Sequence, residues 1–234
     1  MKVTYLYHSG FVVEWDEVVF IFDYFRGELP DLKDAKQIFV FSSHRHYDHF
    51  KRKIFEWKQN YQNITYFLSE DIPKKAYMQD AIFMGPNVSK EYGDLKVRTL
   101  KSTDEGVAFL VHYKGKSLFH AGDLNWWHWE EEGSVFNEMM KRNYQYAISK
   151  IEGESIDIAF IPVDARLGEY CYNGMDWFMK HTCTRYVFPM HFWGDYSVCE
   201  RLCQREEAEE YRDAVMKIKE ENQIFYLEDE IEYI

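Results

Sequence analysis

Residues 42–50 read SSHRHYDHF, and they directly follow QIFVF, an apolar run that is typical of a buried strand. Three histidines and one aspartate therefore fall within six residues, at the point where the strand should end. Imidazole and carboxylate groups bind zinc, iron and manganese, so the stretch indicates either part of a metal site or a solvated histidine-rich loop. So short a stretch cannot surround a metal ion alone, and residues elsewhere in the chain must decide between the two.

The length and composition predict one domain that covers residues 1–234, because 46% of the residues are hydrophobic and no repeat or flexible linker divides the chain. The formal net charge of −12 repels phosphate backbones, so no nucleic-acid partner is expected. No apolar stretch reaches membrane-spanning length, and residues 1–15 contain no signal-peptide core. We therefore expect a cytoplasmic protein with no membrane partner.

Strand-like and helix-like segments alternate along the chain. Strands are expected over residues 4–15, 17–25, 37–42, 64–68, 95–102, 107–123, 156–164, 185–191 and 223–229. Helical segments are expected over residues 50–57, 74–83, 134–150 and 174–181, followed by a charged helix that runs to about residue 220. The buried stripe of that last helix would consist of Ala208, Tyr211, Val215 and Ile218. Such alternation predicts an α/β protein in which sheets pack between helices.

Several of the apolar strands end at residues that can bind a metal or transfer a proton. These residues are His44, His46, Asp48, His49, Asp123, Asp164 and His191. Ligand sites in α/β sheets lie just beyond the carboxyl ends of the strands, so the side chains could share one rim. Each residue also has an ordinary explanation, since Asp48 could cap a helix, Asp123 could form a turn and His191 could be a core histidine. Taken together with residues 42–50, they favour a metal centre.

The spacing within residues 44–49 suits two neighbouring cations. Side chains at positions i and i+2 of an extended segment point the same way, so His44 and His46 can reach one cation. Asp48 and His49 lie beyond the bend and can face a second cation. A carboxylate such as Asp123 can bridge two metals.

The run His44-Arg45-His46-Tyr47-Asp48-His49 resembles the HxHxDH signature of the metallo-β-lactamase superfamily. Residues 7–23 look like the amino-terminal hairpins of that family. FHAGD at 119–123 is similar to its strand with the bridging aspartate, and FPMHF at 188–192 to the segment with its last histidine. The order and spacing resemble the branch that includes the ascorbate-6-phosphate lactonases and many metal-dependent hydrolases.

The resemblance implies a four-layer αββα sandwich with a two-metal site at one edge. It implies that His44 and His46 bind the first metal, and that Asp48, His49 and His191 bind the second, with Asp123 as the bridge. The cofactors would be two divalent ions, with zinc ahead of manganese or iron. A hydroxide held between them would be the nucleophile, and Asp48, as the catalytic residue, would orient the water and accept its proton.

The main departure from the family is a missing histidine. The family supplies one more ligand to the first metal from the loop before the bridging aspartate, but residues 100–111 read LKSTDEGVAFLV. Asp104, and after it Glu105, could provide an oxygen ligand instead, unless they only form a turn. His128 in DLNWWHWEEE could fold back toward the metals or simply pack. A weak or empty first site is the third possibility.

Residues near the expected rim are candidates for substrate binding. His128, Asp164 and Arg166 are the three that we single out, the last two as an anchor for an anionic group or as a structural pair. The tryptophans at 126, 127 and 129 could wall a pocket, pack under the next helix or form an association surface. His8 in YHSGF could support a metal ligand or be an ordinary core histidine.

These features predict a metal-dependent hydrolase that acts on a small-molecule lactone, ester or phosphoester. A phosphodiesterase or nuclease of the same fold is the alternative enzyme, and the net charge of −12 argues against it. A non-catalytic metal-binding protein with a degenerate first site is the alternative of another class, and the missing histidine motivates it.

Overall fold

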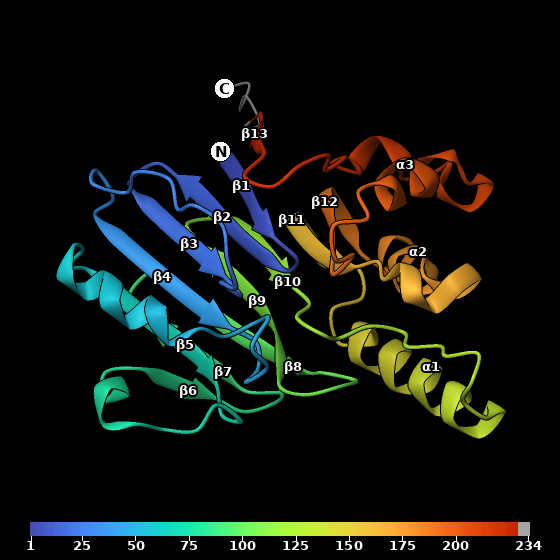
Figure 1. The fold of residues 1–234 in the computed structure, drawn as a ribbon, viewed down its shortest axis with the longest axis horizontal. Helices are drawn as coiled ribbons and strands as arrows, with labels where there is room; N and C mark the ends of the chain where they lie inside the picture. The colour runs from blue at the N-terminus through green and yellow to red at the C-terminus, as the bar shows by residue number, and fades with distance from the viewer. Residues whose placement is uncertain (229–234) are drawn as a thin grey trace.

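Two β-sheets face each other across an apolar core in the computed structural model, which describes residues 1–228 (Figure 1). The first sheet contains, in spatial order, β13 (Ile224–Tyr226), β1 (Lys2–Tyr7), β2 (Gly10–Trp15), β3 (Val18–Phe22), β4 (Gln37–Ser42), β5 (Ile64–Ser69) and β6 (Ile82–Met84). The second contains β12 (Cys183–Met190), β11 (Ser155–Pro162), β10 (Lys116–His120), β9 (Val107–Tyr113), β8 (Leu95–Lys101) and β7 (Ser89–Tyr92).

Helices lie outside both sheets. The second sheet is flanked by α1 (Ser134–Ser149), α2 (Asn173–His181) and α3 (Ser197–Gln204), on the right in Figure 1, and the 3-10 helix η1 (Arg52–Gln59) lies outside the first sheet. Shorter 3-10 segments are η2 (Ala76–Met78), η3 (Ala165–Tyr170), η4 (Glu206–Ala208) and η5 (Arg212–Ala214). This order of helix, sheet, sheet and helix confirms the predicted four-layer αββα sandwich.

The central strands of the first sheet, β3 and β4, are largely apolar because both of their faces are buried. In β3, Phe20 and Phe22 point into the core between the sheets, whereas Val19 and Ile21 point into a second core beneath η1. Neighbouring β4 follows the same alternation, which matches the period of two along a strand. Near-continuous apolar runs of this kind are typical of strands that are covered on both sides.

Parallel pairing brings the carboxyl ends of several strands to one edge. In the first sheet, β4 pairs in parallel with β3 and β5, and in the second, β11 pairs in parallel with β10 and β12. The loops that follow these strands therefore leave from the same edge of their sheets. This is the edge on which the sequence places the candidate site.

The charged helix expected up to about residue 220 is wrong beyond Gln204. The chain continues instead as η4, η5 and an extended segment, in which the Met216 amide donates to the Val187 carbonyl of β12 (2.8 Å). This pairing with a strand replaces the helical hydrogen bonds. Tyr211 and Ile218 are nevertheless buried, as the stripe predicted.

Two shorter helical predictions are also corrected. Residues 74–83 form only η2 before the chain enters β6, where Ile82 pairs in parallel with Phe67 of β5. The helical segment expected over 50–57 is the 3-10 helix η1. Tertiary pairing in the first case overrides the local helical preference.

The strand expected over 223–229 is present as β13, and residues 229–234 lie outside the described part of the chain. Within residues 1–228, no helix combines the length and the apolar character that a membrane span requires.

The close approach of two loops at the site edge requires Gly106. Its φ is +71°, and a Cβ atom there would lie 2.0 Å from the Ser43 carbonyl oxygen and 2.5 Å from the Cβ of His44. We expect Gly106→Ala to lower the free energy of unfolding by at least about 3 kcal/mol, since backbone strain adds to a clash with backbone atoms. Denaturant-induced unfolding would measure this loss.

Gly93, in the turn between β7 and β8, provides a matched control. Its φ is +58°, and a Cβ atom there would meet nothing within 4 Å. Gly93→Ala should therefore cost only the backbone strain, about 1–2 kcal/mol. Equal losses for the two variants would contradict the close packing at Gly106.

Candidate metal centre

The loops at the carboxyl ends of the strands place seven histidine and aspartate side chains in two adjoining clusters. The first cluster consists of His44, His46 and Asp123. The second consists of His8, Asp48, His49 and His191. Within each cluster the candidate ligand atoms all lie within 4.8 Å of one another. The two clusters bring together strand ends from both sheets.

Asp123 lies between the two clusters and presents one oxygen to each. Its Oδ2 lies 3.3 Å from Nε2 of His44, in the first cluster. Its Oδ1 lies 3.2 Å from Nε2 of His49 and 3.3 Å from Nε2 of His191, in the second. A carboxylate in this position can bind two cations at once.

Several polar atoms of the clusters are buried and make no hydrogen bond to any of residues 1–228. They include Nε2 of His49, Oδ1 of Asp123 and both ring nitrogens of His8. An unsatisfied buried polar atom costs about 1–3 kcal/mol, and four within one cluster region call for a ligand. Imidazole and carboxylate donors aimed at common points fit divalent metal ions.

Burial and mutual charge favour the metal-binding protonation states of His8, His44 and Asp123 but act against that of His49. Burial lowers the pKa values of His8 and His44 to about 4, so both rings are neutral at pH 7. Burial acts to raise the pKa of Asp123, but His49 and His191 outweigh it and lower the value to about 2. Burial acts to lower the pKa of His49, but Asp123 and Asp23 raise it to about 9. A proton on His49 would therefore compete with a metal ion there.

Asp23, directly after β3, holds Ser43 and His49 of the first sheet's site loop in place. One carboxylate oxygen accepts the Ser43 amide (2.7 Å), and the other accepts the Ser43 hydroxyl (2.6 Å) and Nδ1 of His49 (2.7 Å). The last bond leaves Nε2 of His49 aimed at Asp123. Carboxylate–histidine pairs of this kind orient metal ligands. Sequence analysis missed Asp23, although FIFD is another apolar strand that ends in a carboxylate.

Asp164 supports His191 in the same way. Its Oδ2 accepts Nδ1 of His191 (3.0 Å), and its Oδ1 accepts the backbone amide (3.0 Å) and Nε (2.9 Å) of Arg166. The residue is only 1% exposed. Of the two roles that the sequence left open for Asp164, these contacts favour the structural pair with Arg166, and of the two residues Arg166 lines the cavity.

His8, in the turn between β1 and β2, belongs to the second cluster itself. Its Nε2 lies 3.4 Å from Oδ2 of Asp48, and its carbonyl accepts the His191 amide (3.1 Å). The side chain is fully buried, and φ is +59°. Of the two readings that the sequence left open, this position favours a role at the metal centre over an ordinary core histidine.

The loop without the histidine places two carboxylates near the first cluster. Oε2 of Glu105 lies 3.5 Å from Nε2 of His46 and has no hydrogen-bond partner, while Oε1 accepts Arg45 (2.6 Å). Asp104 lines the same cavity as His46 but joins neither cluster. Burial, and then the charge of Asp123, raise the pKa of Asp104. Glu105 likewise joins neither cluster, and the His46 nitrogen that faces Nε2 of His44 is Nδ1 (3.0 Å), not the Nε2 near Glu105. Which of the two carboxylates completes the first cluster therefore stays a prediction.

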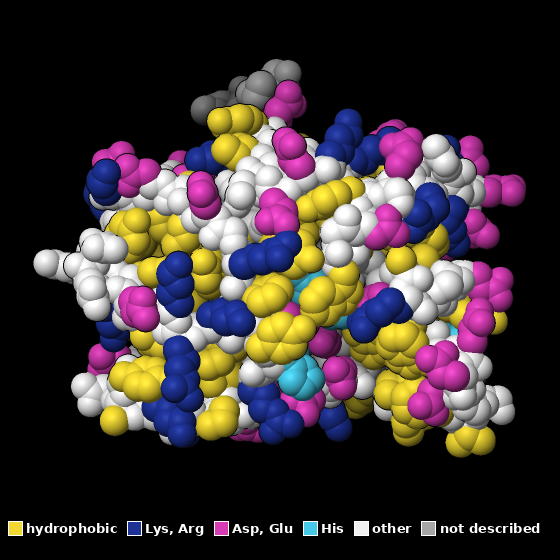
Figure 2. All heavy atoms as spheres, viewed as in Figure 1, with side chains coloured by type: hydrophobic (Ala, Val, Ile, Leu, Met, Phe, Trp, Pro, Cys, Tyr) yellow, Lys and Arg dark blue, Asp and Glu magenta, His cyan; other side chains and the backbone are white. Residues whose placement is uncertain are grey.

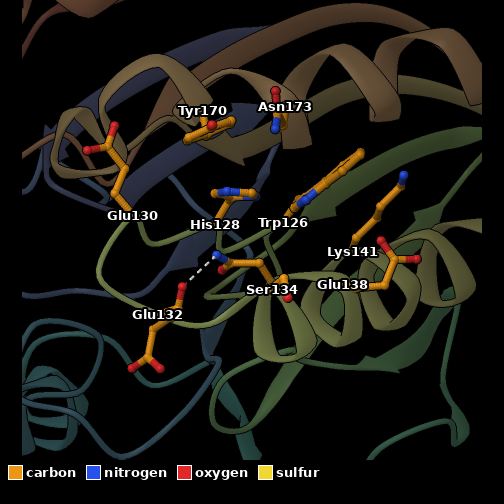
Figure 3. A pocket seen from close by; sticks show the side chains of 10 residues that line it. Trp126, His128, Glu130, Glu132, Ser134, Glu138, Lys141, Tyr170 and Asn173 are labelled. Atoms are coloured by element: carbon orange, nitrogen blue, oxygen red, sulfur yellow. Dashed lines mark hydrogen bonds between the residues drawn. The ribbon is translucent and has the colours of Figure 1, made fainter.

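Of the two positions that the sequence left open for His128, the structure favours packing away from the metal clusters. Its ring stacks on Tyr170, with centroids 3.7 Å apart, in a separate cavity of about 570 Å³ that Trp126 also lines (Figure 3). Trp127 and Trp129 instead line the cavity over the metal centre. Successive side chains of an extended segment point to opposite sides, so His128 shares the orientation of Trp126.

The cavity over the metal centre has a volume of about 470 Å³, and polar and apolar residues share its walls. The apolar and aromatic residues of its lining are Tyr47, Trp127, Trp129, Phe136, Met140 and Trp193. Trp127 also donates from Nε1 to the Asp123 carbonyl (3.0 Å), which fixes this wall to the bridging residue. Arg166 is the cationic residue among the lining side chains.

The sequence model described as "Beta-lactamase superfamily domain" matches residues 2–136, more than half of the chain. The chain therefore belongs to the metallo-β-lactamase superfamily, as its HxHxDH run indicated. The comparisons also confirm the expected class of enzyme, a metal-dependent hydrolase.

Two relatives are described as metal-dependent hydrolases. The protein of Alkaliphilus metalliredigens is 27% identical over 140 residues, which span 53% of this chain and 63% of that protein. The protein of Desulforamulus reducens is 24% identical over 82% of this chain and 84% of its own length. Among solved structures, the metallo hydrolase Igni18 from Ignicoccus hospitalis superposes with a TM-score of 0.62 at 18% identity, covering 97% of this chain and 99% of its own.

The hydrogen bond from His49 to Asp23 predicts a measurable effect on metal affinity. Asp23→Asn keeps the shape of the side chain but removes the charge that orients the ring, and it should weaken metal binding by about 10–100-fold. Competition with a chromogenic chelator would measure the affinity. Asp31→Asn, which changes an exposed carboxylate paired with Lys33, is the matched control and should leave affinity unchanged. Equal affinities for the two variants would show that Asp23 does not support the site.

Proposed function

We propose that this protein is a dinuclear hydrolase that cleaves an ester, lactone or phosphoester bond in a small molecule with an anionic group. The observation that carries the proposal is the position of Asp123, whose two oxygens face the two clusters separately. A mononuclear site would need only one of those oxygens. The buried and unsatisfied donor atoms around it add support.

Each cluster would hold one metal ion. The first would use His44, His46 and one oxygen of Asp123, with Glu105 or Asp104 nearby to complete it. The second would use Asp48, His49 and His191 with the other oxygen of Asp123, and His8 is placed to join them. Bound divalent ions would lower the pKa of water and polarise the oxygen of the bond that is cleaved. Zinc suits the imidazole-rich donors, with manganese or iron as alternatives where carboxylates take part.

The chain's own residues would bind and orient the substrate and move its protons. Asp48 lines the cavity and can accept the proton of the attacking water, because its carboxylate lies between the cavity and His8. Arg166, held by Asp164, can bind an anionic group of the substrate through charge-assisted hydrogen bonds. Trp127 and Trp129 would exclude bulk water from one wall, which strengthens these electrostatic interactions.

Replacing one candidate metal ligand should affect metal binding and hydrolysis without unfolding the protein. His46→Ala should reduce the metal content from two ions per chain toward one and abolish hydrolysis, since the first cluster loses one of its two imidazoles. Elemental analysis would measure the metal, and a panel of esters, lactones and phosphodiesters would report turnover. His112→Ala, in β9 and paired loosely with Glu154, is the matched control and should retain both. Two bound metals without turnover in the wild-type protein would instead identify a non-catalytic metal-binding protein.

Metal removal should also lower stability. Stripping the protein with a chelator leaves the buried donor atoms unpaired, and adding zinc at 100 times its Kd should restore about 2.7 kcal/mol for each site. Thermal unfolding with and without zinc would measure the difference. Asp123→Asn should show a smaller zinc-dependent shift, because the variant loses the charge that faces both clusters. An unchanged midpoint in the wild-type protein would contradict metal binding to the folded state.

A further inference from the structure

Two groups, each of one cation and two aromatic rings, lie beside the cavity over the metal centre. We call them the Arg166 group and the Lys51 group. The Arg166 group comes from segments that follow β10, β11 and β12 of the second sheet, and the Lys51 group from the segments after β3 and β4 of the first sheet. Figure 2 shows Lys and Arg side chains to the left and right of the histidines that surface near the middle of this face. Cations in these places stand out against a net charge of −12.

The Arg166 group consists of Arg166, Trp129 and Trp193. The guanidinium carbon of Arg166 lies 5.6 Å from the ring centroid of Trp129 and 5.8 Å from that of Trp193. Asp164 holds the guanidinium through Nε and Nη2, and Nη1 makes no hydrogen bond to the described residues. The side chain is 54% exposed, so a fixed cation with a spare donor faces the cavity.

The Lys51 group consists of Lys51, Phe25 and Tyr47. The Lys51 ammonium lies 4.7 Å from the ring centroid of Phe25 and 5.3 Å from that of Tyr47, and these two rings pack edge to face at 5.5 Å. Tyr47 lines the cavity and is 62% exposed. Within residues 1–228, Lys51 forms no ion pair.

Aromatic rings hold a cation in place without neutralising its charge, whereas a carboxylate partner would cancel it. Lys51 is therefore a charge without an ion-pair partner among residues 1–228, and it is held against Tyr47, which lines the cavity. Asp164 offsets part of the charge of Arg166, but Nη1 of the guanidinium makes no hydrogen bond to the described residues and is free to donate to an anion. The ring contacts restrain both cations before an anionic ligand binds, so less side-chain conformational entropy is lost on binding.

We propose that the substrate carries two anionic groups, one on each side of the bond that is cleaved, and that Arg166 binds one while Lys51 binds the other. The part between them is apolar or aromatic, because it lies against Trp129, Trp193 and Tyr47. This inference rests on the proposed hydrolase function for its catalytic meaning, although binding of a dianion can be tested without turnover.

Binding of terephthalate, a flat dianion, tests the subsites without catalysis. Isothermal titration of the metal-loaded protein should show terephthalate binding roughly tenfold more tightly than benzoate, the value of one additional charge-assisted hydrogen bond. Lys51→Met and Arg166→Met should each reduce this preference to near unity, and Arg166→Lys should retain part of it. Lys53→Met is the matched control, since Lys53 is exposed, has the same charge and makes no aromatic contact. A preference that survives both Met variants, or that Lys53→Met removes equally, would overturn the proposal.

Hydrolysis of four matched esters tests the positions of the two charges around the cleaved bond. The set is phenyl benzoate with a para-carboxylate on the acyl ring, on the phenol ring, on both or on neither. In each case water adds to the carbonyl carbon, and the single bond between that carbon and the phenolic oxygen breaks. The benzoic acid and the phenol are released. We expect kcat/KM to be highest for the diacid. Lys51→Met should abolish the increase in kcat/KM that one carboxylate gives, and Arg166→Met should abolish the increase that the other gives.

The outcomes separate the two proposals. Turnover of the esters with no dependence on their carboxylates would overturn the two-subsite inference and leave the hydrolase function in place. Dianion binding that depends on Lys51 and Arg166, without turnover of any ester, lactone or phosphodiester, would support the subsites and contradict the proposed function.

Discussion

The carboxylate of Asp123 is the group on which the arrangement of the site depends. It is buried between histidines that come from β4 in one sheet and from β12 in the other, and it reaches both through separate oxygens. The approach of the two sheets at this point is close. Gly122 has φ +54°, and a Cβ atom on it would lie 2.6 Å from the Cβ of Ser43. The strand ends can therefore meet only because glycine precedes Asp123.

Backbone strain collects around the same point. His8, Asp23, His191 and Trp193 all have positive φ, between +42° and +66°. Each such residue costs about 1–3 kcal/mol and persists only where the surrounding structure enforces it. Here the enforcement is visible, because the His191 amide donates to the His8 carbonyl and Asp23 is held by Ser43. The strain turns these residues at the strand ends, where their side chains meet the metal clusters or pack against them.

Much of the fold follows from sequence because the period of two in β3 and β4 matches burial on both faces. The clustering of His44, His46, Asp48, His49, Asp123 and His191 also follows, since a residue at the carboxyl end of a parallel strand has a defined place. Asp23 carried the same signal and was overlooked beside the denser histidine run. His8 gave a weaker signal, because it sits in a hairpin turn where a polar residue is ordinary.

The errors have a common physical origin in contacts between distant segments. The helix expected beyond Gln204 fails because Met216 pairs with Val187 of β12, some thirty residues earlier in the chain. Local periodicity cannot reveal that partner. The position of His128 depends on which face of the segment 126–129 the helix α1 covers, and Asn137 of α1 fixes this by bonding both the amide and the carbonyl of Trp129. Once Trp129 faces the metals, His128 must face Tyr170.

The two halves of the centre are not equivalent, and the difference follows from the missing histidine. The second cluster offers three imidazoles and Asp48, all buried, whereas the first offers two imidazoles, one of them on His46, whose side chain is 45% exposed. A divalent ion binds more tightly to a buried, nitrogen-rich set than to an exposed one completed by carboxylates. The second cluster should hence load before the first.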